Sequence, residues 1–265
     1  MFGQVYNDEN KFFVSGQEII GIDSLDISYS NSASIAKYVG FKRGNTITTG
    51  PTQSRVSISR SLIFADPLYN YTGNSQISGS INYQDSSYGF NSGFLEEYMV
   101  NCAVGSLPKV TTNIVVYDEF RRNIKDASGS VEPPSVLIPN QGSISLVCDN
   151  SSTNRVVGFD YSVKCMRRPI YSIGSKFPKE ICLIKPIEFA ASVQIDVDDA
   201  LLQNSMNLFL NKENKTVSFL IKSNDGANTL QSLTIPNASL VAESLSSSAD
   251  GGVKLTLNYI GHLDL

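Results

Sequence analysis

Carboxylates are the side chains of this chain whose spacing could support metal binding or acid–base catalysis. Asp196, Asp198 and Asp199 lie within four positions, and Glu188 lies eight residues upstream. Such a group could ligate calcium, or supply the acid and base of a glycoside hydrolase. The calcium-loop pattern, with its central Gly and terminal Glu, is missing. We therefore interpret Asp196 and Asp198 as the solvated face of a strand and Asp199 as a helix cap, and predict no metal, catalytic or cofactor-binding residue.

Other catalytic chemistry lacks its usual residues. The single histidine, His262, leaves little basis for Ser-His-Asp, Cys-His or most zinc mechanisms, and no phosphate-binding Gly-rich loop is present. The net charge of −4 argues against a protein that grips nucleic acid by neutralising phosphates. The pairs Arg121-Arg122 and Arg167-Arg168 are too isolated for a basic patch and suit interdomain or intersubunit salt bridges. We expect a protein that is not an enzyme.

The cysteines and the N-terminus bear on the compartment. No two of the four cysteines form a Cys-x-x-Cys pair, so we expect reduced, mostly buried thiols and no disulfide among Cys102, Cys148, Cys165 and Cys182. Residues 1–8 show no signal-peptide pattern, and no run of 18 apolar residues could form a membrane anchor. The expectation is a chain made and kept in a cytoplasm.

Alternating apolar and polar residues predict a mainly β fold. Helical signals are few and short. Asp66-Pro67 predicts a helix start, because Asp caps helices and Pro favours the first helical position. Asn91 or Ser92 could cap a helical turn over Leu95–Met99, with Glu96 and Glu97 on its exposed side. The expected strands cover residues 25–29, 77–83, 113–117 (buried on both faces), 159–163, 193–198 and 253–259, and further helical segments cover 199–203 and 201–210.

Matching spacings between Asp, Gly, Pro and Ser residues in the two halves of the chain indicate an internal repeat. Asp26 lies 14 residues before Gly40, as Asp160 does before Gly174, and Pro51 and Pro186 each lie six residues before a serine. We predict two tandem, similar β-sandwich or β-barrel domains with short flanking helices. The first covers residues 1–125, a Pro/Gly/Ser-rich linker covers 126–142, and the second covers 143–265.

Several segments resemble the tail tube (major tail) proteins of tailed bacteriophages. The resemblance is carried by Gly21 and its strand, the Pro51 segment, the strand that leads to Asp66-Pro67, the stretch 93–98 read as a turn, and the stretch 235–240 before a Ser-rich link and a final alternating strand. It implies β-sandwich or β-barrel cores whose sheets join around a ring, and rings that stack into a channel through which DNA passes without specific binding.

The duplication changes what this resemblance implies for assembly. Single-domain members form hexameric rings, so a duplicated chain implies a trimeric ring with pseudo-sixfold symmetry in the virion tail, assembled in the host cytoplasm. One alternative is a baseplate hub protein with two tube domains. Another, from a different class, is a carbohydrate- or receptor-binding virion protein, which predicts an exposed aromatic platform. The predicted partners are copies of the same chain and other tail proteins, through loops at residues 42–55 and 84–92.

Overall fold

A computed structural model describes residues 10–36, 46–63, 65–83, 86–122, 142–149, 151–197, 215–222, 229–248 and 251–264. In these ranges the chain forms antiparallel strands and a short 3₁₀ helix, η2 (Pro67–Tyr71). The strands are β1 (Asn10–Val14), β2 (Gln17–Ile19), β3 (Ile22–Ala36), β4 (Thr46–Ser61), β5 (Gln76–Tyr83), β6 (Ser86–Ala103), β7 (Lys109–Val116), β8 (Arg121–Arg122), β9 (Ile144–Cys148), β10 (Ser151–Thr153), β11 (Val156–Lys164), β12 (Arg167–Ile170), β13 (Glu180–Leu183), β14 (Ile187–Val197), β15 (Lys215–Lys222), β16 (Thr229–Ser248) and β17 (Gly251–Leu263).

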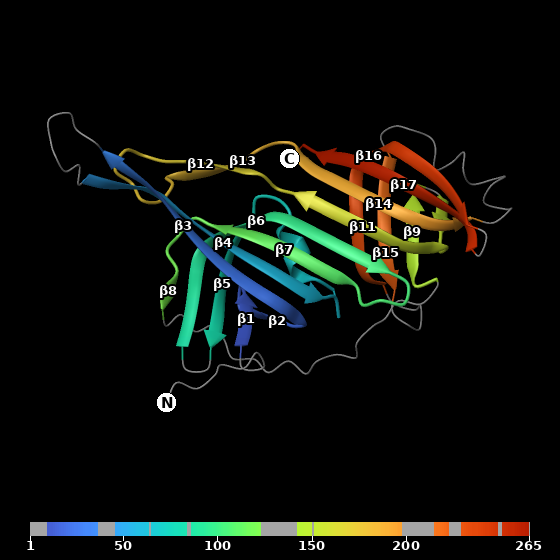
Figure 1. Ribbon diagram of the computed structural model, residues 1–265, viewed down its shortest axis with the longest axis horizontal. Helices are drawn as coiled ribbons and strands as arrows, with labels where there is room; N and C mark the ends of the chain where they lie inside the picture. Colours follow the sequence, from blue (N-terminus) through green and yellow to red (C-terminus); the bar gives the residue numbers. More distant parts are fainter. Residues whose placement is uncertain are drawn as a thin grey trace.

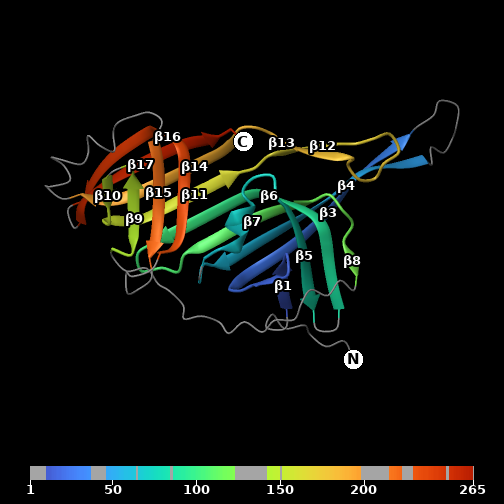
Figure 2. The same cartoon turned by 180° about the vertical axis from the view of Figure 1, so that it is seen from behind.

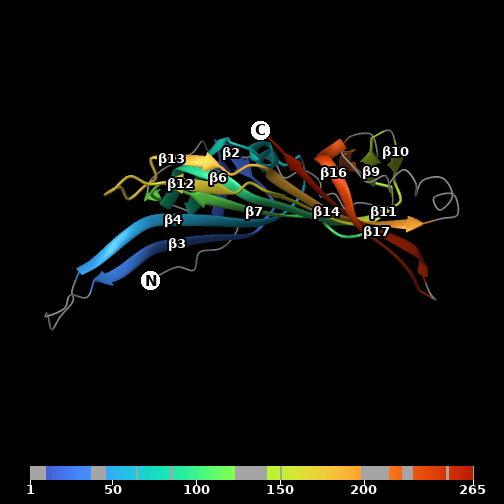
Figure 3. The same ribbon diagram turned by 90° about the horizontal axis from the view of Figure 1, so that it is seen from above.

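A main antiparallel sheet crosses the whole molecule, which confirms the predicted mainly β class. Its strands lie in the order β3-β4-β7-β6-β11-β14-β17-β16. β3 and β16 therefore form its two opposite margins (Figure 1), and the view from above shows the sheet running from the β3–β4 end to the β16–β17 end (Figure 3). The small β12–β13 hairpin pairs separately from this sheet.

Two smaller groups of strands cover one face of the main sheet (Figure 2). One contains β2, β1, β5 and the first part of β6, and the other contains β10, β9, β15 and the first part of β16. β6 and β16 therefore pass from one layer to the other. Gly79 and Gly93 make room beside the bend of β6, because a Cβ atom at either glycine would come within 2.6 Å of the Phe90 ring. In β16, the bend contains Pro236 and Asn237, whose φ is +47°.

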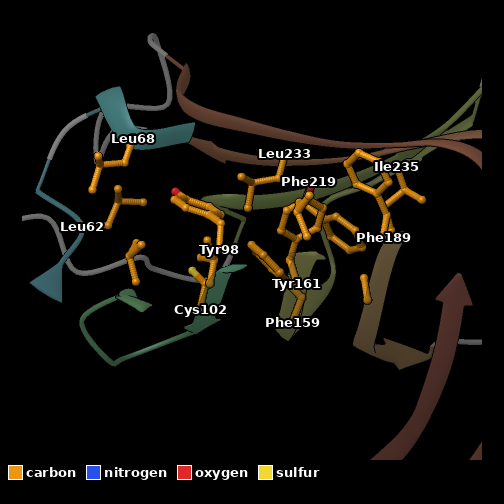
Figure 4. Packing of buried hydrophobic residues seen from close by; sticks show 14 of the residues in the cluster. Leu62, Leu68, Tyr98, Cys102, Phe159, Tyr161, Phe189, Phe219, Leu233 and Ile235 are labelled. Atoms are coloured by element: carbon orange, nitrogen blue, oxygen red, sulfur yellow. The ribbon is translucent and has the colours of Figure 1, made fainter. Parts of the chain in front are cut away.

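The layers enclose one continuous hydrophobic core. Phe159 of β11 stacks on Phe219 of β15 with ring centroids 4.7 Å apart, so the main sheet and its covering strands meet face to face. Figure 4 shows the same packing continuing to Tyr98 and Leu62 of the N-terminal half. The buried side chains therefore unite both halves of the chain.

The predicted alternation in β14 is confirmed from Val193 to Ile195 and is lost at Asp196 and Val197. Val193 and Ile195 are buried and Gln194 is exposed, while Asp196 and Val197 are half-buried. The 113–117 segment is also buried on both faces from Ile114 onward, as its apolar run predicted. Residues 198–214, including Asp198, Asp199 and the expected helices, and residues 126–141 of the expected linker lie outside the described residues.

A buried polar cluster surrounds Asp66, the predicted cap of η2. Asp66 Oδ1 accepts a hydrogen bond from the Leu68 backbone N–H at 2.7 Å, and Oδ2 accepts one from Tyr98 Oη at 2.9 Å. The Arg60 guanidinium forms an ion pair with the same carboxylate. The Asp66 backbone N–H donates to Gln231 Oε1 at 2.8 Å. Because Gln231 belongs to β16, the hydrogen bonds of this cluster connect the first half of the chain to the second.

Two sequence predictions were wrong. Leu95–Met99 is not a helical turn but part of β6. The register of β6 against β7 shifts between Leu95 and Glu97, so Glu96 is an extra residue in a β-bulge. The polar stretches 42–55 and 84–92, predicted as loops, largely belong to β4 and β6.

The hydrogen-bond pairing in the N-terminal half is repeated in the C-terminal half, strand for strand. β1, β2, β3, β4, β5, β6 and β7 pair with one another in the same pattern as β9, β10, β11, β14, β15, β16 and β17.

The registers of the two halves also match. Asp26 lies opposite Ser57 in β3–β4, and Asp160 lies opposite Ser192 in β11–β14. Asn113 and Asn258 continue these two rows in β7 and β17. The same three-strand row of Asp, Ser and Asn therefore recurs in both halves, although the spacing along the chain differs: 31 and 32 residues from Asp to Ser, and 56 and 66 residues from Ser to Asn.

Several irregularities of the pairing also match between the halves. The β6–β7 bulge between Leu95 and Glu97 has its counterpart between Leu240 and Ala242 in β16–β17. The two-residue turns after β1 and β9 each begin with a non-glycine residue at φ +49°, Ser15 and Asp149. A bulge adds a residue at one defined place, so shared bulges mark corresponding positions more sharply than shared strands do.

Candidate interaction surface at the sheet edges

Of the carboxylates that could have formed a catalytic or calcium site, the two in the described ranges, Glu188 and Asp196, do not come together. Glu188 and Asp196 lie eight residues apart on the single strand β14, which places them about 26 Å apart at the usual rise of a strand. The carboxyl pairs of glycoside hydrolases are about 5–10 Å apart, so these two cannot act as one. Within the described residues, no group of three or more His, Cys, Asp or Glu side chains is placed to hold a metal ion.

The charged residues singled out by their sequence spacing make structural contacts. Glu96 pairs with Arg55 at 2.7 Å, and Glu97 accepts a hydrogen bond from Asn113 Nδ2 at 3.0 Å. Arg167 of β12 reaches the first half of the chain, where its guanidinium lies 4.4 Å from the centre of the Phe94 ring and donates to Asn74 Oδ1 at 3.0 Å. Arg167 therefore connects the two halves of the chain through a cation–π contact and hydrogen bonds, where a salt bridge was predicted.

The cysteines are free thiols. Cys102, Cys148 and Cys165 are buried, and Cys182 is half-buried. Burial raises the pKa of Cys102 to about 12. A thiol held protonated at neutral pH is a poor nucleophile, so the position of Cys102 favours a packing role.

The seam between the two halves is a strand pair inside the main sheet. β6 pairs with β11 from Glu97–Lys164 to Ala103–Gly158. At its centre Val100 lies opposite Tyr161, and both side chains are at least 98% buried. Gly158 suits this seam, because a Cβ atom there would lie 3.1 Å from the Cβ atom of Ala103.

The two margin strands of the main sheet correspond, in the other half of the chain, to the two strands of the seam. By the shared pairing pattern, β3 corresponds to β11 and the second part of β16 corresponds to the second part of β6. Among the described strands, β3 pairs only with β4, and residues 239–248 of β16 pair only with β17. Each margin therefore presents a strand edge of the kind that the seam joins.

Apolar side chains are exposed at these margins. Ile27 of β3 is 40% exposed, whereas its counterpart Tyr161 is 2% exposed. Leu245 of β16 is 56% exposed, whereas its counterpart Val100 is 1% exposed. Backbone groups and apolar side chains that are open together on one strand form a template for strand addition.

Sequence reasoning missed these margin residues. Ile27 and Leu245 stand in alternating, serine-rich segments that read as ordinary half-buried strands. Their exposure depends on which strands become margins, and that order follows from pairing between residues far apart in the chain. The available signal was the repeat itself, because it relates each margin strand to a seam strand.

A shallow apolar hollow lies on the other face of the main sheet and extends from β7 and β6, across the seam, to Val241 of β16. Its volume is about 560 Å³, and Met99, Ala190, Val241 and Ile260 contribute to its lining. A second hollow of about 430 Å³ adjoins it beside Ile260 and His262. Val241 and Ile260 are each at least half exposed. The hollows therefore extend the apolar surface of the β16 margin onto the sheet face.

No aromatic platform appears on this surface. Among the described residues, Tyr29 is the one aromatic side chain in the set of exposed large hydrophobic residues. In the same part of the chain, no helix has the length and apolarity needed to cross a membrane. The chain matches no protein-family profile and no curated protein sequence.

Proposed function

We propose that this chain is a non-enzymatic structural protein that assembles into rings, in the manner of tailed-phage tail tube proteins. Its two halves are copies of one seven-stranded unit, and three chains close a ring of six units. The ring forms part of the virion tail and leaves a channel through which DNA passes. The sheet margins are the assembly surface.

The observation that carries this proposal is the relation of the seam to the margins. The chain already joins one unit to another through β6 and β11, and it presents the corresponding strands open at both ends. A surface pair that is complementary but not identical produces head-to-tail association, which forms a closed ring when the rotation between units fits. The matching registers and bulges of the halves support the equivalence of the units.

A polar row on the outward face of the main sheet, beside the apolar hollow, suits a channel that does not bind DNA. The row carries Asp160, Ser192 and Asn258, and the corresponding row of the first half carries Asp26, Ser57 and Asn113. Hydroxyl, amide and carboxylate groups offer no cluster of cations for phosphates. This composition supports passage without specific binding.

Native mass spectrometry of the purified full chain, followed by negative-stain microscopy, tests the proposal. We expect a three-chain species at micromolar concentration and ring-shaped particles with a central opening. A chain that remains monomeric at these concentrations, whatever the salt and the time allowed, would contradict self-assembly. That result would favour a hub subunit that requires other virion proteins, or a receptor-binding protein.

A further inference from the structure

We infer that β16 of one copy pairs antiparallel with β3 of the next copy, in the register that β6 and β11 use within the chain. This inference rests on the proposed ring assembly, and it names the partner strand and the residue pairs. The partner is a second copy of the same chain, placed head to tail.

The register follows from the positions that the two halves share. Residues of β3 correspond to residues of β11 that are 134 positions later, because Asp26 and Asp160 occupy the same place against β4 and β14. Residues of β6 correspond to residues of β16 that are 145 positions later, because the bulges coincide. The seam pair Tyr161–Val100 therefore predicts the pair Ile27–Leu245 between copies.

This pairing brings the two exposed apolar side chains of the margins together. Ile27 and Leu245 become cross-strand neighbours on the core side of the sheet, where Tyr161 and Val100 are buried at the seam. A shift of one residue would turn one of these side chains to the polar face, so burial of the pair selects this register. The pair thus takes the place in the interface that Tyr161 and Val100 take inside the chain.

Polar residues on the opposite face fit the same register. At the seam, Asn101 Nδ2 donates to Asp160 Oδ1 at 2.6 Å. The corresponding pair between copies is Ser246 and Asp26, and a serine hydroxyl can donate to a carboxylate in the same way. Both faces of the strand pair are therefore compatible with one placement.

The neighbouring hairpin gives independent support. Inside the chain, the β12–β13 hairpin, which connects β11 to β14, covers Phe94, Val115 and Tyr117 with Ile181. The corresponding second-half positions of these three residues are Ser239, Ile260 and His262, which lie in the open hollow of about 430 Å³.

The segment that would cover this hollow is the corresponding hairpin of the next copy. β3 and β4 continue beyond Asn31 and Thr52 as a long strand pair, at the place in the chain where the second half has β12 and β13. Head-to-tail placement sets this arm over Ile260, which is 50% exposed in the single chain. One placement thus accounts for the exposed residues at the margin and for the hollow beside it.

Disulfide trapping between Ser28→Cys and Ser244→Cys tests the register. These residues correspond to Ser162 and Met99, which lie opposite each other at the seam. The Cys165 backbone N–H donates to the Glu96 carbonyl three pairs away, so the alternation of an antiparallel ladder makes Ser162–Met99 a non-hydrogen-bonded pair. Such pairs have the closest Cα atoms, about 4.5 Å apart, within the range of disulfides.

The experiment uses the full chain with Cys182→Ser, to remove the more accessible native thiol, and oxidised glutathione as the two-electron acceptor. The variant with Ser28→Cys and Ser244→Cys should give covalently linked chains, up to closed trimers in which every engineered thiol is paired. The matched control, Ser28→Cys with Ser246→Cys, places the thiols on a diagonal with Cα atoms about 7–8 Å apart and should link poorly. Each single variant alone should stay unlinked, and mixing the two single variants should give linked pairs.

The outcomes separate this inference from the proposed function. Efficient linking of the diagonal control, or of one single variant with itself, would overturn the register or the head-to-tail arrangement. Oligomers seen by native mass spectrometry without linking at Ser28–Ser244 would overturn the inference and leave ring assembly standing. A monomer in the same measurement would contradict both. Hydrogen exchange of the unmodified chain gives a second readout, since β3 and residues 239–248 of β16 should become protected as concentration rises.

Discussion

Asn101 donates a hydrogen bond to Asp160 across the seam between the two halves of the chain, with 2.6 Å between Nδ2 and Oδ1. Asp26 occupies the corresponding position on the β3 margin of the main sheet, and Ser246 occupies the position of Asn101 on the β16 margin. The side-chain contact across the seam is thus formed once inside the chain, and the two margins of the sheet carry residues that could form the corresponding contact between copies. Assembly of copies should depend on margin residues and hardly at all on residues in the middle of the sheet.

Leu245→Glu should weaken self-association. The substitution replaces an exposed apolar side chain at the β16 margin with a charge that the contact would have to desolvate. We expect the dissociation constant to rise at least tenfold, about 1.4 kcal/mol, as measured by sedimentation equilibrium. Gln194→Glu is the matched control, because it adds the same charge at an exposed site on β14, away from the margins. An equal effect of both variants would point to net charge and not to the margin.

Ile195→Ala should destabilise the folded chain by about 2–5 kcal/mol. Ile195 is 1% exposed, and its strand lies between β11 and β17. Removal of its side-chain atoms leaves a cavity that rigid neighbouring strands cannot fill. Urea unfolding followed by circular dichroism measures the loss, with Gln194→Ala as the exposed neighbour on the same strand. A loss below about 1 kcal/mol would show that β14 is less tightly enclosed than the structure indicates.

Asp66→Ala should cost more than Tyr98→Phe. The first change leaves the buried Arg60 guanidinium without its carboxylate, a situation that typically costs about 3–5 kcal/mol. The second removes one hydrogen bond to a charged group, typically about 1.5–3 kcal/mol, and retains the ring in the core. Urea unfolding of both variants tests the order. The reverse order would mean that packing of the tyrosine dominates the cluster.

The folded chain should lose stability at alkaline pH. Burial raises the pKa of Cys102 to about 12, and it raises the pKa of Tyr98 and Tyr259 above their ordinary value of 10. The unfolded chain then releases these protons at lower pH than the folded chain does. The stabilisation is complete below about pH 9 and declines as the pH rises from there toward 12. Cys102→Ala should make the decline between pH 9 and 11 shallower in urea unfolding, and an unchanged slope would remove the thiol as a cause.

Thiol labelling separates the four cysteines by burial. Cys182 is half-buried and should react first with iodoacetamide, whereas Cys102, Cys148 and Cys165 should react only after unfolding. Mass analysis without reductant should find four free thiols. A disulfide would contradict both the structure and the expectation of a reducing compartment.

Much of the fold could be predicted from local spacing. The strands that contain Asp26 and Asp160 were found because alternation along a strand is visible in the sequence. The equal six-residue steps from Pro51 to Ser57 and from Pro186 to Ser192 pointed to equivalent hairpins. Burial of Val193 and Ile195 followed from the same alternation.

The wrong prediction at Leu95–Met99 has a physical cause in the bulge of β6. The extra residue Glu96 changes the phase of the alternation, so Leu95 and Tyr98 come three positions apart and imitate the spacing of a helix. The candidate interaction surface could not be predicted from the sequence for another reason. Whether Ile27 or Leu245 lies at a margin depends on the order of strands across the sheet, which is set by contacts distant in the sequence.

The two hairpins that extend from the sheet differ in length and strand pairing, and this difference affects the symmetry of an assembled ring. β3 and β4 continue as one long ladder, whereas the corresponding place in the second half carries the separate β12–β13 pair. A ring of three chains would therefore show long and short projections in alternation around its rim. Image reconstruction with imposed sixfold averaging would blur these projections into one another, while threefold averaging should resolve two distinct kinds. Any protein that docks on the rim would meet three equivalent places and not six.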